Sequence, residues 1–307
     1  MIPDTGPFSL DRTLSCGQVF RWEKRGAWWQ GVIGREVIRM RQEDRILIFS
    51  GAREDTIRDY FQLELDLEEI LQSIDRDPVI HGSLERCRGL RIIRQQPWEC
   101  LASYICATYA NIPGIRKKIA LLSSSFGEPL TTGSQTAFSF PSADILASSD
   151  VCDLARCSLG YRSPYLCETA SMITRNPGWA EKIAAASTPE ARKELVLFRG
   201  VGPKVADCVL LFAFGRYDVF PVDIWITRIM QHWYSLPASA GSEEIAREGR
   251  SRFGRYAGYA QEYLFCDREF LMSGIFSRRP KKKIVKKEES GLFAEEEYPL
   301  PRENHSP

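Results

Sequence analysis

Residues 195–208 read Leu-Val-Leu-Phe-Arg-Gly-Val-Gly-Pro-Lys-Val-Ala-Asp-Cys. The pattern predicts a helix that ends at Phe198, a tight glycine turn, and a second helix that begins near Pro203, because proline suits a first helical turn. Glycine allows φ > 0 and a close approach of another backbone. The free N–H groups of the turn and of the new helix then favour one bound phosphate. The stretch is typical of a helix–hairpin–helix, which grips a DNA backbone without reading its sequence. A plain helical hairpin is the alternative. We expect the DNA contacts of this turn at Gly200, Val201 and Gly202.

Two charged side chains after this turn suit the cleavage of a bond at a sugar carbon. Lys204 stands in the first turn of the second helix, where the helix dipole disfavours a cation and favours the neutral, nucleophilic amine. Asp223 stands where another helix begins and is expected to cap it as a carboxylate. A nucleophile beside an anion suits attack at C1′, where loss of the base builds oxocarbenium character. A phosphate-contacting lysine and a purely structural cap are the simpler alternatives.

The remaining sequence predicts an α+β protein. Residues 1–50 hold four β-branched or aromatic runs separated by turns, at 19–22, 28–33, 37–41 and 46–49, which predict a small antiparallel sheet. From Arg53 onward apolar residues recur at helical steps. The expected helices include 97–109, 115–126, 144–155, 164–175, 189–198, 205–214, 223–234 and 256–272. We therefore expect an N-terminal antiparallel β domain at 1–80, a mostly helical body at 81–275, and a disordered basic and acidic tail at 276–307.

The composition argues against several classes of protein. The chain has 307 residues, 44% of them apolar and 26% charged, as in soluble globular proteins. Its longest apolar run, Val209–Phe214, is far shorter than the roughly 20 residues of a membrane span. Nine cysteines without a Cys-x-x-Cys pair indicate reduced thiols rather than a zinc or iron–sulfur site. We expect no metal, no cofactor and no membrane partner. The net charge of +1 means that DNA contacts must come from local groups.

Further sequence blocks accompany the hairpin in one order. They are Cys16–Trp22, Arg94–Leu101, Leu159–Arg162, Pro221–Asp223 and Tyr256–Gln261. Together they resemble the helix–hairpin–helix DNA glycosylases, most specifically the 8-oxoguanine DNA glycosylase/AP lyases, from about Phe8 to Ser273. The resemblance implies excision of 8-oxoguanine from duplex DNA and strand cleavage at the abasic site, in base excision repair. A glycosylase for alkylated or other damaged bases and a DNA-binding protein without chemistry are the alternatives.

The resemblance also assigns roles to residues. Lys204 would displace the base and form a Schiff base, and Asp223 would stabilise the charged sugar. The flipped base would lie in a pocket that includes Pro221, between Cys208 and Phe265, with Gln261 at its Watson–Crick edge. The backbone carbonyl of Gly17 would accept the N7–H of the oxidised base, whereas the N7 of normal guanine is itself an acceptor.

The residues that would face the opposite strand depart from the family pattern. Family members commonly carry asparagines and an arginine where this chain has Tyr109, Ala110 and Gly114. The DNA contacts expected in this region are therefore Asn111, Tyr161 and Arg162. Tyr161 would enter the gap left by the flipped base. We expect weak preference for cytosine opposite the lesion. The expected partner is double-stranded DNA containing oxidised guanine, bound by a monomer in the nucleoid-containing cytoplasm of a prokaryote or the nucleus of a eukaryote.

Overall fold

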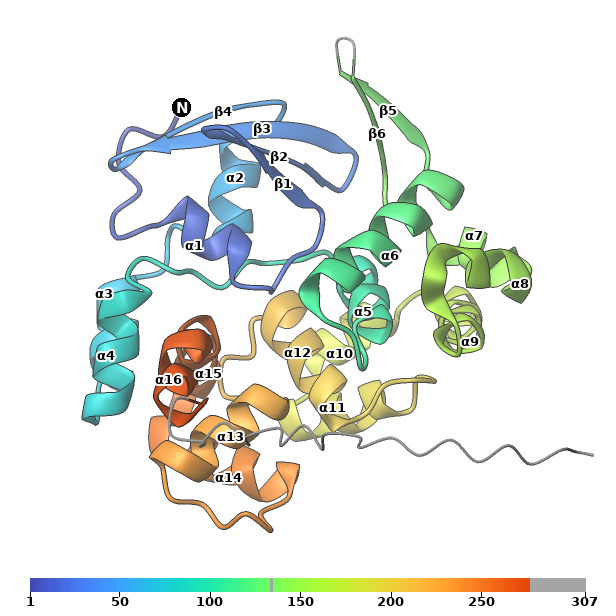
Figure 1. The fold of residues 1–307 in the computed structure, drawn as a ribbon. Helices are drawn as coiled ribbons and strands as arrows, with labels where there is room; N and C mark the ends of the chain where they lie inside the picture. Colours follow the sequence, from blue (N-terminus) through green and yellow to red (C-terminus); the bar gives the residue numbers. More distant parts are fainter. Residues whose placement is uncertain (133–134, 277–307) are drawn as a thin grey trace, which may run out of the picture.

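The N-terminal part of the chain forms a four-stranded antiparallel sheet. A computed structural model describes residues 1–132 and 135–276. The strands run in the order β1 (Trp22–Arg25), β2 (Trp28–Ile33), β3 (Glu36–Glu43) and β4 (Ile46–Ser50) (Figure 1). Alternate residues of β3, Ile38 and Met40, are fully buried, while Arg39 between them is exposed. The buried side chains lie on one face of the sheet, and the helices α1 (Leu10–Ser15) and α2 (Glu54–Tyr60) cover that face.

The first strand begins later than the sequence predicted. Strand β1 starts at Trp22, whereas the run 19–22 was expected to be extended. The backbone before it is engaged elsewhere, because Gln95 donates a side-chain hydrogen bond of 2.8 Å to the carbonyl of Gln18. Val19 and Phe20 are nevertheless buried, as their apolar character requires. The four-strand antiparallel prediction is confirmed, with a shift in this one boundary.

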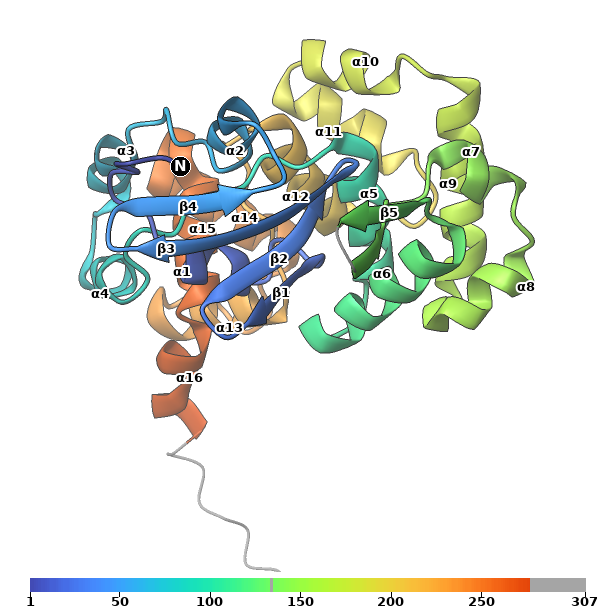
Figure 2. The ribbon, with the colours of Figure 1, turned by 90° about the horizontal axis from the view of Figure 1, so that it is seen from above.

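The body that follows is helical. In both views the sheet and the helices α7–α9 (143–175) lie toward opposite sides of the molecule (Figures 1 and 2). A short hairpin, β5 (Pro129–Thr132) and β6 (Gln135–Phe138), interrupts the helical order. The helices of the body are α3 (Leu67–Ile74), α4 (Pro78–Arg86), α5 (Pro97–Cys106), α6 (Ile112–Phe126), α7 (Ala143–Ser148), α8 (Val151–Leu154), α9 (Arg162–Arg175), α10 (Trp179–Ala185), α11 (Thr188–Val196), α12 (Pro203–Phe214), α13 (Ile224–Trp233), α14 (Ser242–Phe253), α15 (Ala257–Cys266) and α16 (Arg268–Phe276), with a π-helical turn at 155–159 and a 3-10 turn at 254–256.

Two predicted helices are each divided in the structure. The segment 256–272 forms α15 and α16, which meet at Asp267, and the segment 144–155 includes most of α7 and α8. Asp150 begins α8 by accepting a hydrogen bond of 2.6 Å from the backbone of Cys152, a local device that stops the preceding helix. The sequence analysis missed α1, α4, α10, α14 and the β5–β6 hairpin. Helix α14 is mostly polar and buries only Ile245, Ala246, Gly249 and Phe253, so few apolar residues mark it in the sequence.

The buried apolar residues form two clusters. The first lies between the sheet and its helices and runs from Ile2 to Phe61, with Ile93 added. The second fills the helical body from Leu67 to Met272 and also takes Cys16 and Phe20. The α+β class is therefore confirmed, and the domain limits at residue 80 stay a prediction. The predicted tail, apart from residue 276, lies outside the described residues. In the described part of the chain, no helix combines the length and apolarity that crossing a membrane requires.

Candidate active site

The hairpin between α11 and α12 forms as predicted, but its two glycines differ. Gly200 has φ +81°, and a Cβ there would lie 3.0 Å from the side chain of Tyr165. Gly202 is extended at φ −91°, with open space around it, so only Gly200 needs a positive φ. No side chain caps α12, and Pro203 carries no N–H. The first-turn amides of α12 therefore remain available for an anion at the positive end of the helix dipole.

Val201, between the glycines, stabilises the turn from inside. Its side chain is buried, and its N–H donates a hydrogen bond of 3.1 Å to the carbonyl of Phe198. This N–H is thus used within the protein, which differs from the expectation that the whole turn offers free amides. A DNA contact at Val201 stays a prediction.

Lys204 is half-buried in the first turn of α12 and lies against an aromatic ring. Its Nζ is 5.2 Å from the ring centroid of Tyr104 on α5. That ring stacks on Phe212 of α12, at 5.6 Å between centroids and 10° between planes. The packing of α5 on α12 therefore provides the surface over which the amine lies.

Asp223 caps α13 as predicted. Its Oδ1 accepts hydrogen bonds of 2.9 Å from the N–H groups of both Trp225 and Ile226. Among the described residues, no hydrogen bond is made to Oδ2, so the cap occupies one carboxylate oxygen and leaves the other available. The structural role of this residue is therefore compatible with a chemical one.

Cys208 lies four residues after Lys204 on α12, so the two residues share one face of the helix. Burial raises the pKa of this thiol to about 12; the charge of Lys204 lowers it, and the charges of Asp207, Glu262 and Asp223 raise it. The thiol itself stays protonated and behaves as a small apolar surface.

The proposed pocket for the base is assembled from distant parts of the chain. Gly17 has φ +111°, and a Cβ there would lie 3.4 Å from Cε1 of Phe265 and 2.7 Å from Cδ1 of Ile112. Gly17 and Phe265 are therefore neighbours, as the resemblance implied. Ile112, at the start of α6, was not singled out from the sequence, because an isoleucine at a helix start carries no chemical signal.

The backbone around Gly17 is fixed by the side chain of Gln18. Its Nε2 donates to the carbonyl of Arg91, and its Oε1 accepts from the N–H of Ile93, both at 2.8 Å. The Gln18 carbonyl accepts from Gln95, also at 2.8 Å. Gln18 is 1% exposed, so these bonds act without competition from water. They fix the side chain and the carbonyl of Gln18, and so restrain the backbone next to Gly17.

Two adjacent polar residues of α15 are buried beside this pocket. Gln261 is 5% exposed, and its Oε1 has no hydrogen-bond partner among the described residues. Glu262 is 2% exposed, and burial raises the pKa of its carboxyl to about 7. The Cys16 thiol and the charges of Arg268 and Lys204 lower this pKa, and the charge of Asp223 raises it. The sequence analysis missed Glu262, because a helical glutamate is normally solvent-exposed.

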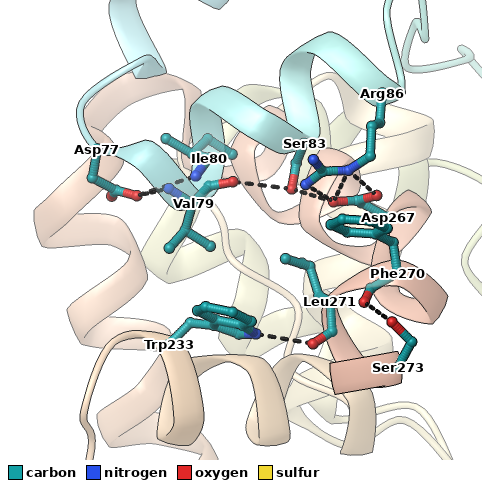
Figure 3. A network of polar contacts seen from close by, with 10 residues as sticks. All are labelled: Asp77, Val79, Ile80, Ser83, Arg86, Trp233, Asp267, Phe270, Leu271 and Ser273. Carbon is teal, nitrogen blue, oxygen red and sulfur yellow. Dashed lines mark hydrogen bonds and ion pairs between the residues drawn. The ribbon is translucent and has the colours of Figure 1, made fainter. Parts of the chain in front are cut away.

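A network of polar contacts fixes the helix junction that carries Phe265. Figure 3 shows the carboxylate of Asp267 between Arg86 and Ser83 of α4. Arg86 donates through Nη2 at 2.6 Å and Ser83 through Oγ at 2.8 Å. On the other side, the Arg268 guanidinium lies 4.2 Å from the ring centroid of Phe265. These contacts explain why the predicted single helix breaks at Asp267, and they hold the Phe265 ring in position.

The residues predicted to face the opposite strand lie together but are used differently. Arg162 is 8% exposed, and its guanidinium donates to the carbonyls of Thr108 and Leu159. Asn111 caps α6, since its Oδ1 accepts from the N–H of Gly114 at 2.9 Å. Tyr161 is 50% exposed. DNA contacts by Arg162 and Asn111 stay predictions, and in this structure their polar groups mainly stabilise the loops.

Pro221 is buried two residues before Asp223. Its place in the base pocket stays a prediction. Among residues 1–132 and 135–276, no group of three or more histidine, cysteine, aspartate or glutamate side chains forms a metal-ligand cluster.

The α+β fold, the hairpin, and the lysine and aspartate beside it define a helix–hairpin–helix DNA glycosylase. Comparison with known proteins agrees: residues 2–101 match the 8-oxoguanine DNA glycosylase N-terminal domain, and residues 116–255 match the HhH-GPD superfamily of base excision DNA repair proteins. The chain therefore belongs to the 8-oxoguanine DNA glycosylase family. This confirms the resemblance and favours it over the alternatives of an alkylated-base glycosylase and a binding protein without chemistry.

Individual relatives support the same family. The N-glycosylase/DNA lyase OGG1 of Arabidopsis thaliana is 32% identical, over 84% of this chain and 76% of its own. The apo-form of the Clostridium acetobutylicum 8-oxoguanine glycosylase/lyase superposes with a TM-score of 0.81 at 33% identity, covering 84% of this chain and 92% of that one. MBOgg1, solved with a low-affinity DNA ligand, gives a TM-score of 0.83 at 36% identity, covering 86% and 93%.

Proposed function

We propose that this chain excises 8-oxoguanine from duplex DNA with Lys204 as the nucleophile and then cleaves the strand at the abasic site. The observation that carries the assignment is the half-buried Lys204 in the first turn of the hairpin's second helix, together with Asp223, which caps α13 through one oxygen and keeps the other free of hydrogen bonds among the described residues. An amine and a free carboxylate oxygen suit a reaction that builds positive charge on a sugar.

The chemistry follows from these groups. The Lys204 amine forms a bond to C1′ as the C1′–N9 bond breaks, and the electrons of that bond leave with the base, which takes up a proton. Loss of the amine proton and opening of the sugar ring give a Schiff base. Removal of a C2′ proton then expels the 3′ phosphate, which is β-elimination. The free oxygen of Asp223 stabilises the positive charge at the sugar during the first step.

The selectivity for oxidised guanine is assigned to the fixed carbonyl of Gly17. A carbonyl accepts the N7–H that oxidation at C8 creates, and it repels the lone pair at N7 of normal guanine. The unpartnered Oε1 of buried Gln261 is suited to accept a hydrogen bond from the Watson–Crick edge of the flipped base.

The protein acts on genomic DNA as a monomer, in the nucleoid-containing cytoplasm or the nucleus, and it needs no metal or cofactor.

The nucleophile is tested by chemical trapping. Borohydride should reduce the Schiff base and leave a covalent protein–DNA adduct on a duplex with one 8-oxoguanine. Lys204→Gln should abolish the adduct and retain binding of the damaged duplex within about tenfold, because only the reacting amine is lost. Lys182→Gln, on the exposed surface of α10, is the matched control and should trap normally. An undiminished adduct with Lys204→Gln would place the nucleophile elsewhere.

A further inference from the structure

Tyr109, in the loop between α5 and α6, has an aromatic side chain that no packing explains. It is 99% exposed, the most exposed large hydrophobic side chain among the described residues. Its backbone has φ +49°, and the other described non-glycine residues with positive φ are aspartate, glutamine or serine. A bulky residue in this region is strained, and such strain persists where surrounding structure imposes it, often at binding sites.

The structure holds this loop firmly to a neighbouring one. Arg162, at the start of α9, donates from Nε to the Thr108 carbonyl at 3.0 Å. The hydroxyls of Thr108 and Tyr161 are 3.5 Å apart, and the Arg162 guanidinium lies 4.4 Å from the ring centroid of Tyr161. The buried arginine therefore joins the two loops, one of which carries Tyr109 and the other Tyr161.

A chain of contacts links Tyr161 to the hairpin. The rings of Tyr161 and Tyr165 are in edge contact at 6.0 Å. Tyr165 in turn lies against Gly200, where a Cβ would come within 3.0 Å of it. Thr108, whose hydroxyl is 3.5 Å from that of Tyr161, directly precedes Tyr109 in the chain. The loop of Tyr109 is therefore joined through Tyr161 and Tyr165 to the hairpin that suits a phosphate.

We infer that Tyr109 stacks on the base left unpaired opposite the flipped lesion and reads it by its π-face instead of its hydrogen-bonding edge. The inference rests on the proposed function, since it requires a flipped nucleotide. Every base has a π-face, so aromatic stacking tolerates any base. Arg162 is already hydrogen-bonded within the protein, and Tyr109 offers a single hydroxyl. The opposite base is therefore held without being selected.

Fluorescence of 2-aminopurine placed opposite 8-oxoguanine tests the stacking directly. Lys204→Gln is used as the background so that the lesion is bound and not excised. In this background the probe should stay quenched, because the Tyr109 ring covers it. Adding Tyr109→Ala should raise the fluorescence several-fold and weaken duplex binding about tenfold. Tyr109→Phe should remain quenched, and Ile46→Ala, exposed on β4, is the control.

A second measurement separates stacking from a structural role. Tyr109→Asn replaces a strained residue by one that tolerates the left-handed region, so its melting temperature should rise. The same variant should lose the quenching and show a larger preference for cytosine, because an amide offers both a donor and an acceptor. A lower melting temperature of Tyr109→Asn would show that the tyrosine stabilises the folded protein.

The inference alone would be overturned if Tyr109→Ala bound the duplex with unchanged quenching and excised the lesion normally when Lys204 is intact. Absent excision in the wild type would instead overturn the proposed function.

Discussion

The surroundings of Gly17 and the loop of Tyr109 are built in opposite ways. The backbone beside Gly17 is restrained by Gln18, a buried side chain with hydrogen bonds at both ends of its amide. Tyr109 stands almost completely in solvent on a strained backbone. Under the proposed function, a single polar atom at Gly17 distinguishes oxidised from normal guanine and requires rigid placement, whereas the exposed ring of Tyr109 supports the opposite base without selecting it. On that proposal we expect strict selection of the lesion and loose selection of its partner.

The largest effect is expected from Asp223, which belongs to neither recognition region. Asp223→Asn keeps an oxygen for the cap of α13 but removes the charge that stabilises the sugar. Single-turnover base excision should fall by about 10²–10⁴-fold, while the circular dichroism spectrum and duplex binding stay close to the wild type. A loss of only a few-fold would leave Asp223 with its capping role alone.

Gly17→Ala tests whether the backbone at Gly17 must be placed rigidly. The new methyl would lie 2.7 Å from Ile112, on a backbone at φ +111° that alanine rarely adopts. Displacement of the carbonyl by even about 1 Å should lower excision roughly 10²-fold. Gly26→Ala serves as the control, because that glycine also has a positive φ but has open space around it. Equal losses of excision in both variants would mean that strain in general, rather than this carbonyl, limits the reaction.

Glu262 is a buried acid beside the predicted base pocket, so its titration makes the stability of this region depend on pH. Its pKa is about 7 in the folded protein, raised by burial from an ordinary 4.5. A raised pKa means that stability is fully present below about pH 4.5 and is lost as the pH rises through 7. Between pH 5 and 8 the wild type should lose about 2–3 kcal/mol of unfolding free energy that Glu262→Gln retains. Urea unfolding at both pH values measures this. Parallel losses in the two proteins would contradict the burial of a titrating carboxyl.

The smallest effect is expected from a change of the base opposite the lesion, which we infer to stack on Tyr109. Excision of 8-oxoguanine opposite cytosine, adenine, guanine and thymine should differ by less than about a hundredfold, because one lost bidentate contact removes ~1–3 kcal/mol of discrimination. Single-turnover rates on four duplexes that differ only in the opposite base test this. A cytosine preference above that range would mean that Asn111, Arg162 and Tyr161 suffice to read the opposite base.

The predictable parts of the site are those with local signals. Pro203 and Asp223 begin helices in ways that sequence alone specifies, and the hairpin follows from its glycines. The break at Asp267 could not be predicted, because its partners Ser83 and Arg86 are more than 180 residues away. The burial of Glu262 depends on packing between helices, which the sequence does not specify. In the same way, Arg162 looks like a free cation until the structure shows the carbonyls around it.

Ile112, at the start of α6, touches Gly17, and Tyr109 lies three residues before it in the loop that leads into α6. Under the proposed function, this short segment contacts the damaged base at one end and the opposite base at the other. A displacement of the segment by binding at one end then changes the free energy of binding at the other, and this coupling free energy is the same in both directions.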